Sequence, residues 1–155
     1  MEPISQEEIS KVFGVAQIYL PDLVGIKWDN LDYLGWLHPS GLKAYFVLVS
    51  PETGRLTGCI LRRELRIAAR PRFEMCSFCH HVHRYNGTAM FTLSIKGTYG
   101  RHLIGKILCE DLNCSLRIRN LIEPSSYMAE TLYTEARVWR MQKSMHRWLK
   151  KANRL

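Results

Sequence analysis

The alternation of apolar and polar positions predicts both helices and strands, beginning with a short helix near the N-terminus. Ser5-Gln6-Glu7-Glu8 has the S-x-x-E pattern of a capping box, and the apolar residues after it follow helical spacing. Pro21 ends any continuation of this helix. The segment from Leu23 to Leu37 mixes aromatic and polar residues, and we expect it to be buried anchoring structure.

Four apolar segments have the length and composition of β-strands. They are Ala44–Val49, Leu56–Leu61, Thr88–Ile95 and Leu103–Leu108. Turns containing Pro51 and Gly54, and Gly97 and Gly100, join them into two hairpins. We expect Cys59, inside the second strand, to be a small buried side chain. The basic stretch 62–72 connects the two hairpins and leads into a pair of cysteines.

The last part of the chain predicts one long helix, from Thr134 to about Asn153. Its apolar stripe consists of Val138, Met141, Met145, Trp148 and Ala152. Its basic stripe consists of Arg140, Lys143, Arg147, Lys150 and Arg154. The stripes are two residues out of phase, so they face opposite ways. The predicted fold class is α+β, a small antiparallel sheet with flanking helices, in one domain covering residues 1–155.

Charge and the character of the N-terminus narrow the classes of function. The formal net charge is +8, which favours an acidic partner such as RNA, DNA, the ribosome or an acidic protein surface, although solubility alone would also explain it. The N-terminus lacks the pattern of a signal peptide, and no apolar run approaches the roughly 20 residues of a membrane helix. We therefore expect a cytoplasmic protein without a membrane partner, in which cysteines are rarely paired as disulfides.

Two close cysteine pairs predict a structural zinc site. Cys76 and Cys79 are spaced C-x2-C, and Cys109 and Cys114 are spaced C-x4-C. Four thiolates form a tetrahedral zinc site with no position left for a reactant. We expect Asp111 to cap a short helix over 112–119 that carries Cys114 in its first turn. A knuckle, a hairpin and a helix with the last ligands make a treble clef, here over about residues 73–120.

Other interpretations of the first cysteine pair explain less of the sequence. Cys76-Ser77-Phe78-Cys79-His80 matches the pattern for c-type haem attachment, but that chemistry requires export. A redox C-x-x-C usually opens a helix, whereas histidines follow here. His80, His81 and His83 could supply a ligand or hold a second metal, but we expect polar loop residues, one of them hydrogen-bonded to a ligand sulfur. The motifs of common enzymes are missing, so we do not expect catalysis.

Three stretches resemble the C-terminal treble-clef zinc-finger domain of the FusB-type proteins, a bacterial family that binds elongation factor G and confers fusidic acid resistance. They are Trp28–Trp36, Met75–Cys79 and, most specifically, Gly105–Arg119. The resemblance implies one zinc ion held by Cys76, Cys79, Cys109 and Cys114. It also implies binding to elongation factor G, which resistance members free from ribosomes stalled by fusidic acid.

The chain departs from the resistance members in two respects. They can place a histidine where this chain has Cys79, which changes the charge of the site. They also carry a helical domain ahead of the zinc domain, for which 155 residues leave no room. The resemblance therefore implies the zinc fold more strongly than it implies resistance.

The turn between the last two predicted strands is the main candidate for partner binding. It combines Lys96, Tyr99 and Arg101 with flexible glycines, as docking loops often do, although a solvated turn would look the same. We expect Lys106, Arg117 and Arg119 to extend this surface, with a plain solvated face as the alternative. The first functional hypothesis is a zinc-stabilised binding module that engages elongation factor G or the ribosome, as the resemblance implies. Direct binding to RNA or DNA through the basic faces is the second, and a metal-dependent enzyme is the third.

Overall fold

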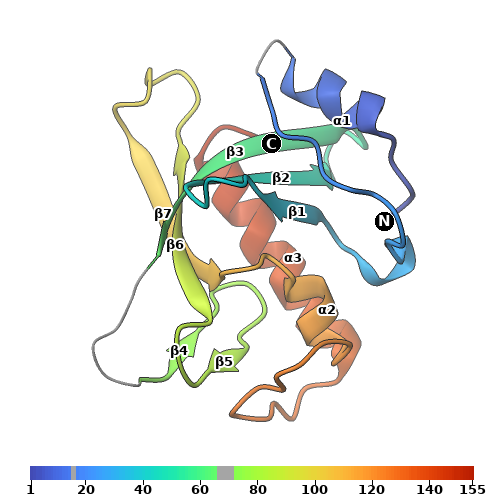
Figure 1. The fold of residues 1–155 in the computed structure, drawn as a ribbon, viewed down its shortest axis with the longest axis vertical. Coiled ribbons are helices and arrows are strands. Elements are labelled where there is room, and N and C mark those ends of the chain that lie inside the picture. Colours follow the sequence, from blue (N-terminus) through green and yellow to red (C-terminus); the bar gives the residue numbers. More distant parts are fainter. Residues whose placement is uncertain (15–16, 66–71) are drawn as a thin grey trace.

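A five-stranded antiparallel sheet forms the centre of the molecule in a computed structural model that describes residues 1–14, 17–65 and 72–155 (Figure 1). The strands lie in the order β1-β2-β3-β6-β7. Their bounds are Leu34–Leu37 for β1, Lys43–Val49 for β2, Leu56–Leu65 for β3, Thr88–Ser94 for β6 and Leu103–Cys109 for β7. Each strand pairs with a neighbour close in sequence, which is typical of a sheet built from hairpins.

The helices and a small ribbon complete the α+β fold that the sequence predicts. The ribbon pairs β4 (Glu74–Met75) with β5 (Val82–His83). The helices are α1 (Gln6–Phe13), the 3₁₀ turn η1 (Trp28–Asn30), α2 (Cys114–Ile118) and α3 (Thr134–Lys151). The predicted capping box is present, since the side chains of Ser5 and Glu8 each accept a hydrogen bond from the other's backbone N–H.

Strand β2 is covered on both of its faces. Phe46 and Leu48 belong to one cluster of buried side chains, which includes the apolar stripe of α3. Tyr45 and Val47 point the other way, into a second cluster with Ile9 of α1 and the segment that precedes β1. Because successive side chains of a strand alternate between faces, an all-apolar strand such as β2 requires cover on both sides.

The contact between α1 and β3 depends on a glycine. A Cβ atom at Gly58 would lie 2.6 Å from Cγ1 of Val12 and 2.9 Å from Cζ of Phe13. These distances are shorter than van der Waals contact. The missing side chain at Gly58 therefore lets α1 lie directly on the strand.

The structure differs from the sequence-based prediction at several boundaries. Leu34–Leu37, expected only as buried anchoring structure, forms strand β1. The strand expected to end at Leu61 continues to Leu65, and residues 66–71 of the basic stretch lie outside the described residues. Asp111 does not cap α2: the residue before the helix is Asn113, whose backbone N–H donates to Asp111. Among the described residues no helix is both long and apolar enough to cross a membrane.

Candidate metal centre

Four cysteine sulfurs meet at the junction of the ribbon, β7 and α2. Cys76 and Cys79 lie in the turn between β4 and β5, Cys109 ends β7, and Cys114 begins α2. All four are buried, and their Sγ atoms lie within 4.8 Å of one another. The Sγ atoms of Cys76 and Cys114 are 3.6 Å apart, and those of Cys79 and Cys109 are 3.5 Å apart. A tetrahedral zinc ion with Zn–S bonds near 2.3 Å places its sulfurs about 3.8 Å apart. The arrangement therefore fits one zinc ion held by thiolates.

Backbone hydrogen bonds give the two ligand-bearing segments their shape. The turn after Cys76 is closed by a bond from the N–H of His80 to the carbonyl of Cys76, with His80 at a φ of 57°. The N–H of Ser77 donates to the carbonyl of Ile107, so the turn is joined to β7. After Cys109 the chain reverses at Leu112, whose φ is 58°, before α2 begins. Two tight reversals thus direct ligands far apart in sequence toward one point.

Several groups outside the four cysteines contact the sulfurs. The backbone N–H groups of Phe78 and Cys109 donate to Sγ of Cys76, at 3.4 and 3.3 Å. Nε2 of His83 lies 3.3 Å from Sγ of Cys109. Such contacts orient ligands and disperse the negative charge of thiolates.

The three histidines near the first cysteine pair differ in their surroundings. None of them belongs to the group that could hold the metal in the described part of the chain. His83 is buried against Cys109, and a Cβ atom at Gly87 would lie only 2.0 Å from Nδ1 of His83. His81 is also buried, and burial, together with nearby His83 and Arg117, lowers its pKa to about 4. The neutral form of His81 therefore prevails at physiological pH.

The cysteine thiols become deprotonated when they bind the metal ion. Hydrogen bonds with the other three sulfurs, together with burial, raise the pKa of the Cys109 thiol well above its usual range. Coordination to a divalent cation reverses this effect, because a coordinating thiol is deprotonated. Four thiolates around Zn²⁺ leave two net negative charges in a buried site, so nearby cations stabilise the filled centre.

Arg117 is one such cation, since its charge interacts with Cys109 and Cys79, and its side chain is 8% exposed. Its guanidinium donates to the Asp111 carboxylate at 2.7 Å. Burial alone would lower the pKa of Arg117, but Asp111 and the cysteines Cys109 and Cys79 outweigh burial and raise it. The positive charge of Arg117 is therefore balanced by groups inside the molecule.

Arg119, at the C-terminal end of α2, is similarly occupied. Its guanidinium forms an ion pair with the Asp32 carboxylate, whose side chain is 6% exposed, and the Nε2 amide of Gln142 donates to the same carboxylate. Asp32 thus joins the segment before β1 to α2 and α3. The expectation that Arg117 and Arg119 extend an outer surface does not match these positions.

The other candidates for partner binding are more accessible. Lys96, Tyr99 and Arg101 are exposed in the loop between β6 and β7, as the sequence suggests. Lys106 lies further along β7, half-buried, and its Nζ donates to Oγ of Ser144 on α3. The six residues therefore do not form one continuous surface.

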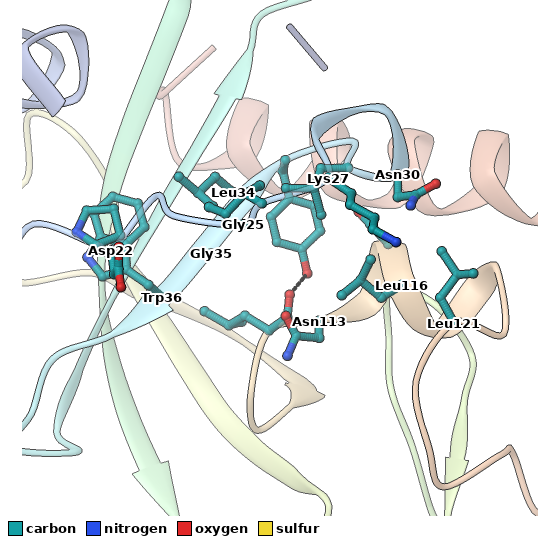
Figure 2. A pocket seen from close by; sticks show the side chains of 16 residues that line it. Asp22, Gly25, Lys27, Asn30, Leu34, Gly35, Trp36, Asn113, Leu116 and Leu121 are labelled. Carbon is teal, nitrogen blue, oxygen red and sulfur yellow. Dashed lines mark hydrogen bonds between the residues drawn. The ribbon is translucent and has the colours of Figure 1, made fainter. Parts of the chain in front are cut away.

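A cavity of about 450 Å³ lies beside the metal centre, between the segment that precedes β1 and the start of α2 (Figure 2). Its side chains include Leu34 and Trp36 from β1 and Leu116 from α2, with Asn113 at one margin. Across it the hydroxyl of Tyr33 donates to the carbonyl of Leu112, the residue at the reversal between Cys109 and Cys114. The N-terminal part of the chain thus supports the loop between the last two cysteines.

Comparison with known proteins agrees with this geometry. A family model described as "FBP C-terminal treble-clef zinc-finger" matches residues 10–152. The chain belongs to this family. Membership, together with the four-cysteine cluster, assigns the FBP-type domain one structural zinc ion.

A solved structure shows the same fold at low sequence identity. The fusidic acid resistance protein FusC superposes with a TM-score of 0.63 at 17% identity, over 97% of this chain. The chain spans 59% of the length of FusC. A comparison with curated proteins finds no match. At this identity the similarity to FusC shows a shared fold.

The contact of His83 with Cys109 matches the expectation that one of the three histidines hydrogen-bonds a ligand sulfur, but His81 and His83 are buried rather than polar loop residues. Two contributors to the site, Asp32 and Gly87, were not found from sequence. No local signal points to them, because their importance comes from residues that only the fold brings close.

Proposed function

We propose that this FBP-type domain is a binding module, stabilised by zinc, that engages elongation factor G, free or on the ribosome. The observation that carries the proposal is the loop between β6 and β7, which presents Tyr99 at 97% exposure. A large, fully exposed aromatic side chain is costly to leave in water, and aromatic residues are enriched at protein interfaces. Lys96 and Arg101 flank it, and neither forms an ion pair within the part of the chain that the structure describes.

Backbone hydrogen bonds within the loop and to the end of α3 order the loop. The N–H of Thr98 donates to the carbonyl of Ile95, and that of Arg101 donates to the carbonyl of Thr98. The N–H of Lys96 donates to the carbonyl of Ala152, at the end of α3, at 2.9 Å. A preorganised loop loses less conformational entropy when it binds, which favours a role in recognition.

The metal centre lies at the other end of the same hairpin. Thr88, the first residue of β6, pairs with Cys109, the last residue of β7. A zinc ion bound to Cys109 therefore fixes the far end of the two strands that carry the loop. In this proposal zinc contributes to recognition by stabilising the hairpin, and with four thiolate ligands it has no open position for catalysis.

The family supports elongation factor G as the partner. The chain belongs to the FBP C-terminal family, and it shares its fold with FusC, a protein named for fusidic acid resistance. The resemblance of Met75–Cys79 and Gly105–Arg119 to proteins that bind elongation factor G points to the same partner.

Titration of the zinc-loaded protein with purified, nuclease-treated elongation factor G tests the proposal. Tyr99→Ala should weaken binding at least tenfold, as expected for a central aromatic contact. Tyr133→Ala is the matched control, because Tyr133 is also highly exposed but lies at the start of α3. No binding by the unaltered protein, or equal affinity of all three proteins, would contradict the proposal.

A further inference from the structure

A cleft with three cationic side chains lies between β7 and α3, away from the loop that carries Tyr99. It has a volume of about 620 Å³, and Lys106 of β7 and Arg147 and Lys151 of α3 line it. The described residues that line it include no aspartate or glutamate. Cationic side chains from two elements therefore line one cleft, and no acidic side chain of the lining balances their charge.

The exposed cations of this cleft differ from others on the same helix. Arg140 forms an ion pair with Glu130, and Lys150 forms one with Glu52. Among the described residues, by contrast, neither Arg147 nor Lys151 has an ion-pair or hydrogen-bond partner. Acidic neighbours thus compensate other cations of α3 but leave these two available.

Polar groups at the base of the cleft add hydrogen-bonding capacity. Nζ of Lys106 donates to Oγ of Ser144 at 3.3 Å, and this hydroxyl donates to the carbonyl of Ser77 at 3.1 Å. Trp148 also lines the cleft, and its buried indole N–H has no hydrogen-bond partner among the described residues.

The three positive charges influence one another. Burial lowers the pKa of Lys106, and the charges of Lys151 and Arg147 lower it further, against the opposite effect of Cys76. A bound anion would relieve this repulsion between like charges.

We propose that this cleft binds phosphate groups of an RNA backbone. Arg147 and Lys151 are four residues apart on α3, so they lie one above the other on one helix face and form a short row of charge. A row of cations beside serine hydroxyls suits the repeated phosphates of a polynucleotide, which arginine, lysine and serine side chains commonly contact. The proposal does not depend on binding to elongation factor G, because the residues that carry it are different.

The test compares two variants that remove equal charge from α3. Arg147→Gln with Lys151→Gln removes the free cations of the cleft. Lys143→Gln with Lys150→Gln removes two cations outside the cleft, one of them placed over the ring of Trp139 and one paired with Glu52. Each double variant lowers the formal net charge from +8 to +6. The probe is a fluorescently labelled 12-nucleotide uridine RNA, with anisotropy measured at several salt concentrations.

The unaltered protein should bind the RNA with an affinity that falls as salt rises. The cleft variant should bind about tenfold or more weakly. Because two of its cations no longer neutralise phosphates, its slope of log K against log salt should be shallower by about 1.4. The control variant should stay close to the unaltered protein, and inorganic phosphate should displace the RNA. Equal losses in both variants, or no RNA binding at all, would overturn the proposal. Tighter binding of a hexaglutamate peptide, with the same dependence on the cleft, would overturn the choice of RNA.

Titration of the cleft variant with elongation factor G separates this proposal from the function proposed above. The affinity for the factor should not change when Arg147 and Lys151 are replaced. RNA binding can thus fail while factor binding holds, or the reverse.

Discussion

Nε2 of His83 lies 3.3 Å from Sγ of Cys109, so a side chain outside the cysteine cluster contacts one inside it. The imidazole can hold this position because Gly87 has no side chain to displace it. The pair links the β4–β5 ribbon to the end of β7 through a side-chain contact.

His83→Ala should weaken zinc binding about 10- to 100-fold, the usual effect of removing a group that orients a metal ligand. Competition with a chromophoric chelator measures this affinity. Gly87→Ala should also weaken zinc binding, because the added methyl group would occupy the space of the His83 imidazole. His102→Ala, at an exposed site in the β6–β7 loop, should leave the affinity unchanged. If His83→Ala and Gly87→Ala both retain full affinity, the imidazole contact does not support the site.

Cys109→Ser should release the metal and destabilise the hairpin that ends at this residue. Zinc affinity is part of the folding free energy of a structural site, so the midpoint of thermal unfolding should fall as well. Elemental analysis by mass spectrometry gives the zinc content, and circular dichroism gives the midpoint. Cys59→Ala is the control, and one full equivalent of zinc should remain bound to it, since Cys59 lies in β3 outside the cluster.

Cys59 should also be unreactive in the folded protein. It is 2% exposed, and burial raises its pKa to about 11 despite the opposing charge of Arg154. The thiol is therefore protonated at pH 8, whereas alkylation requires the thiolate. Iodoacetamide treatment of the zinc-loaded protein, followed by peptide mass mapping, should leave Cys59 unmodified until denaturant is added. Rapid modification under native conditions would contradict this account.

Asp32→Ala should destabilise the protein by about 3 kcal/mol, because it leaves the Arg119 guanidinium without its partner in a largely buried place. Denaturant unfolding measures the change. Glu52→Ala removes an exposed ion pair with Lys150 and should have little effect. Similar stability of the two variants would mean that the Asp32 network contributes no more than a surface contact.

Gly58→Ala should cost about 1 to 3 kcal/mol, because the new methyl group enters space occupied by α1. The same substitution combined with Val12→Ala should cost less than the sum of the two single changes, since Val12 is the nearest obstacle. If the double variant loses as much free energy of unfolding as the two single variants together, α1 moves away from the added methyl group freely.

Local patterns predicted the parts of the fold that depend on local chemistry. The capping box at Ser5 and the spacing of the four cysteines can be read from short stretches, and the structure contains both features. The zinc ion followed from the cysteine spacing, and the fold class followed from the patterns of strands and helices. The long helix could be predicted for the same reason, since an apolar stripe repeats over several turns.

The features that the sequence did not reveal depend on distant neighbours. β1 is short and contains Gly35, which weakens any strand pattern; the structure places Gly35 against Leu112, so close that a Cβ atom would lie 2.8 Å from the leucine Cβ. Arg119 seemed to be a surface cation because its partner, Asp32, is 87 residues away. Charge patterns cannot distinguish a solvated arginine from one paired inside the fold.

The uneven cover of the sheet bears on where another macromolecule can attach. α3 covers one face, whereas α1 and the N-terminal segment cover the other face only over β1, β2 and the start of β3, so Ile60, Arg62 and Glu64 of β3 and Leu103 and Gly105 of β7 are exposed. Hairpin ends, the seams between layers and this open part of the sheet all lie outside the buried core. Such sites can diverge in sequence without disturbing the interior, so relatives with this scaffold can acquire different partners while the metal-bound centre stays the same.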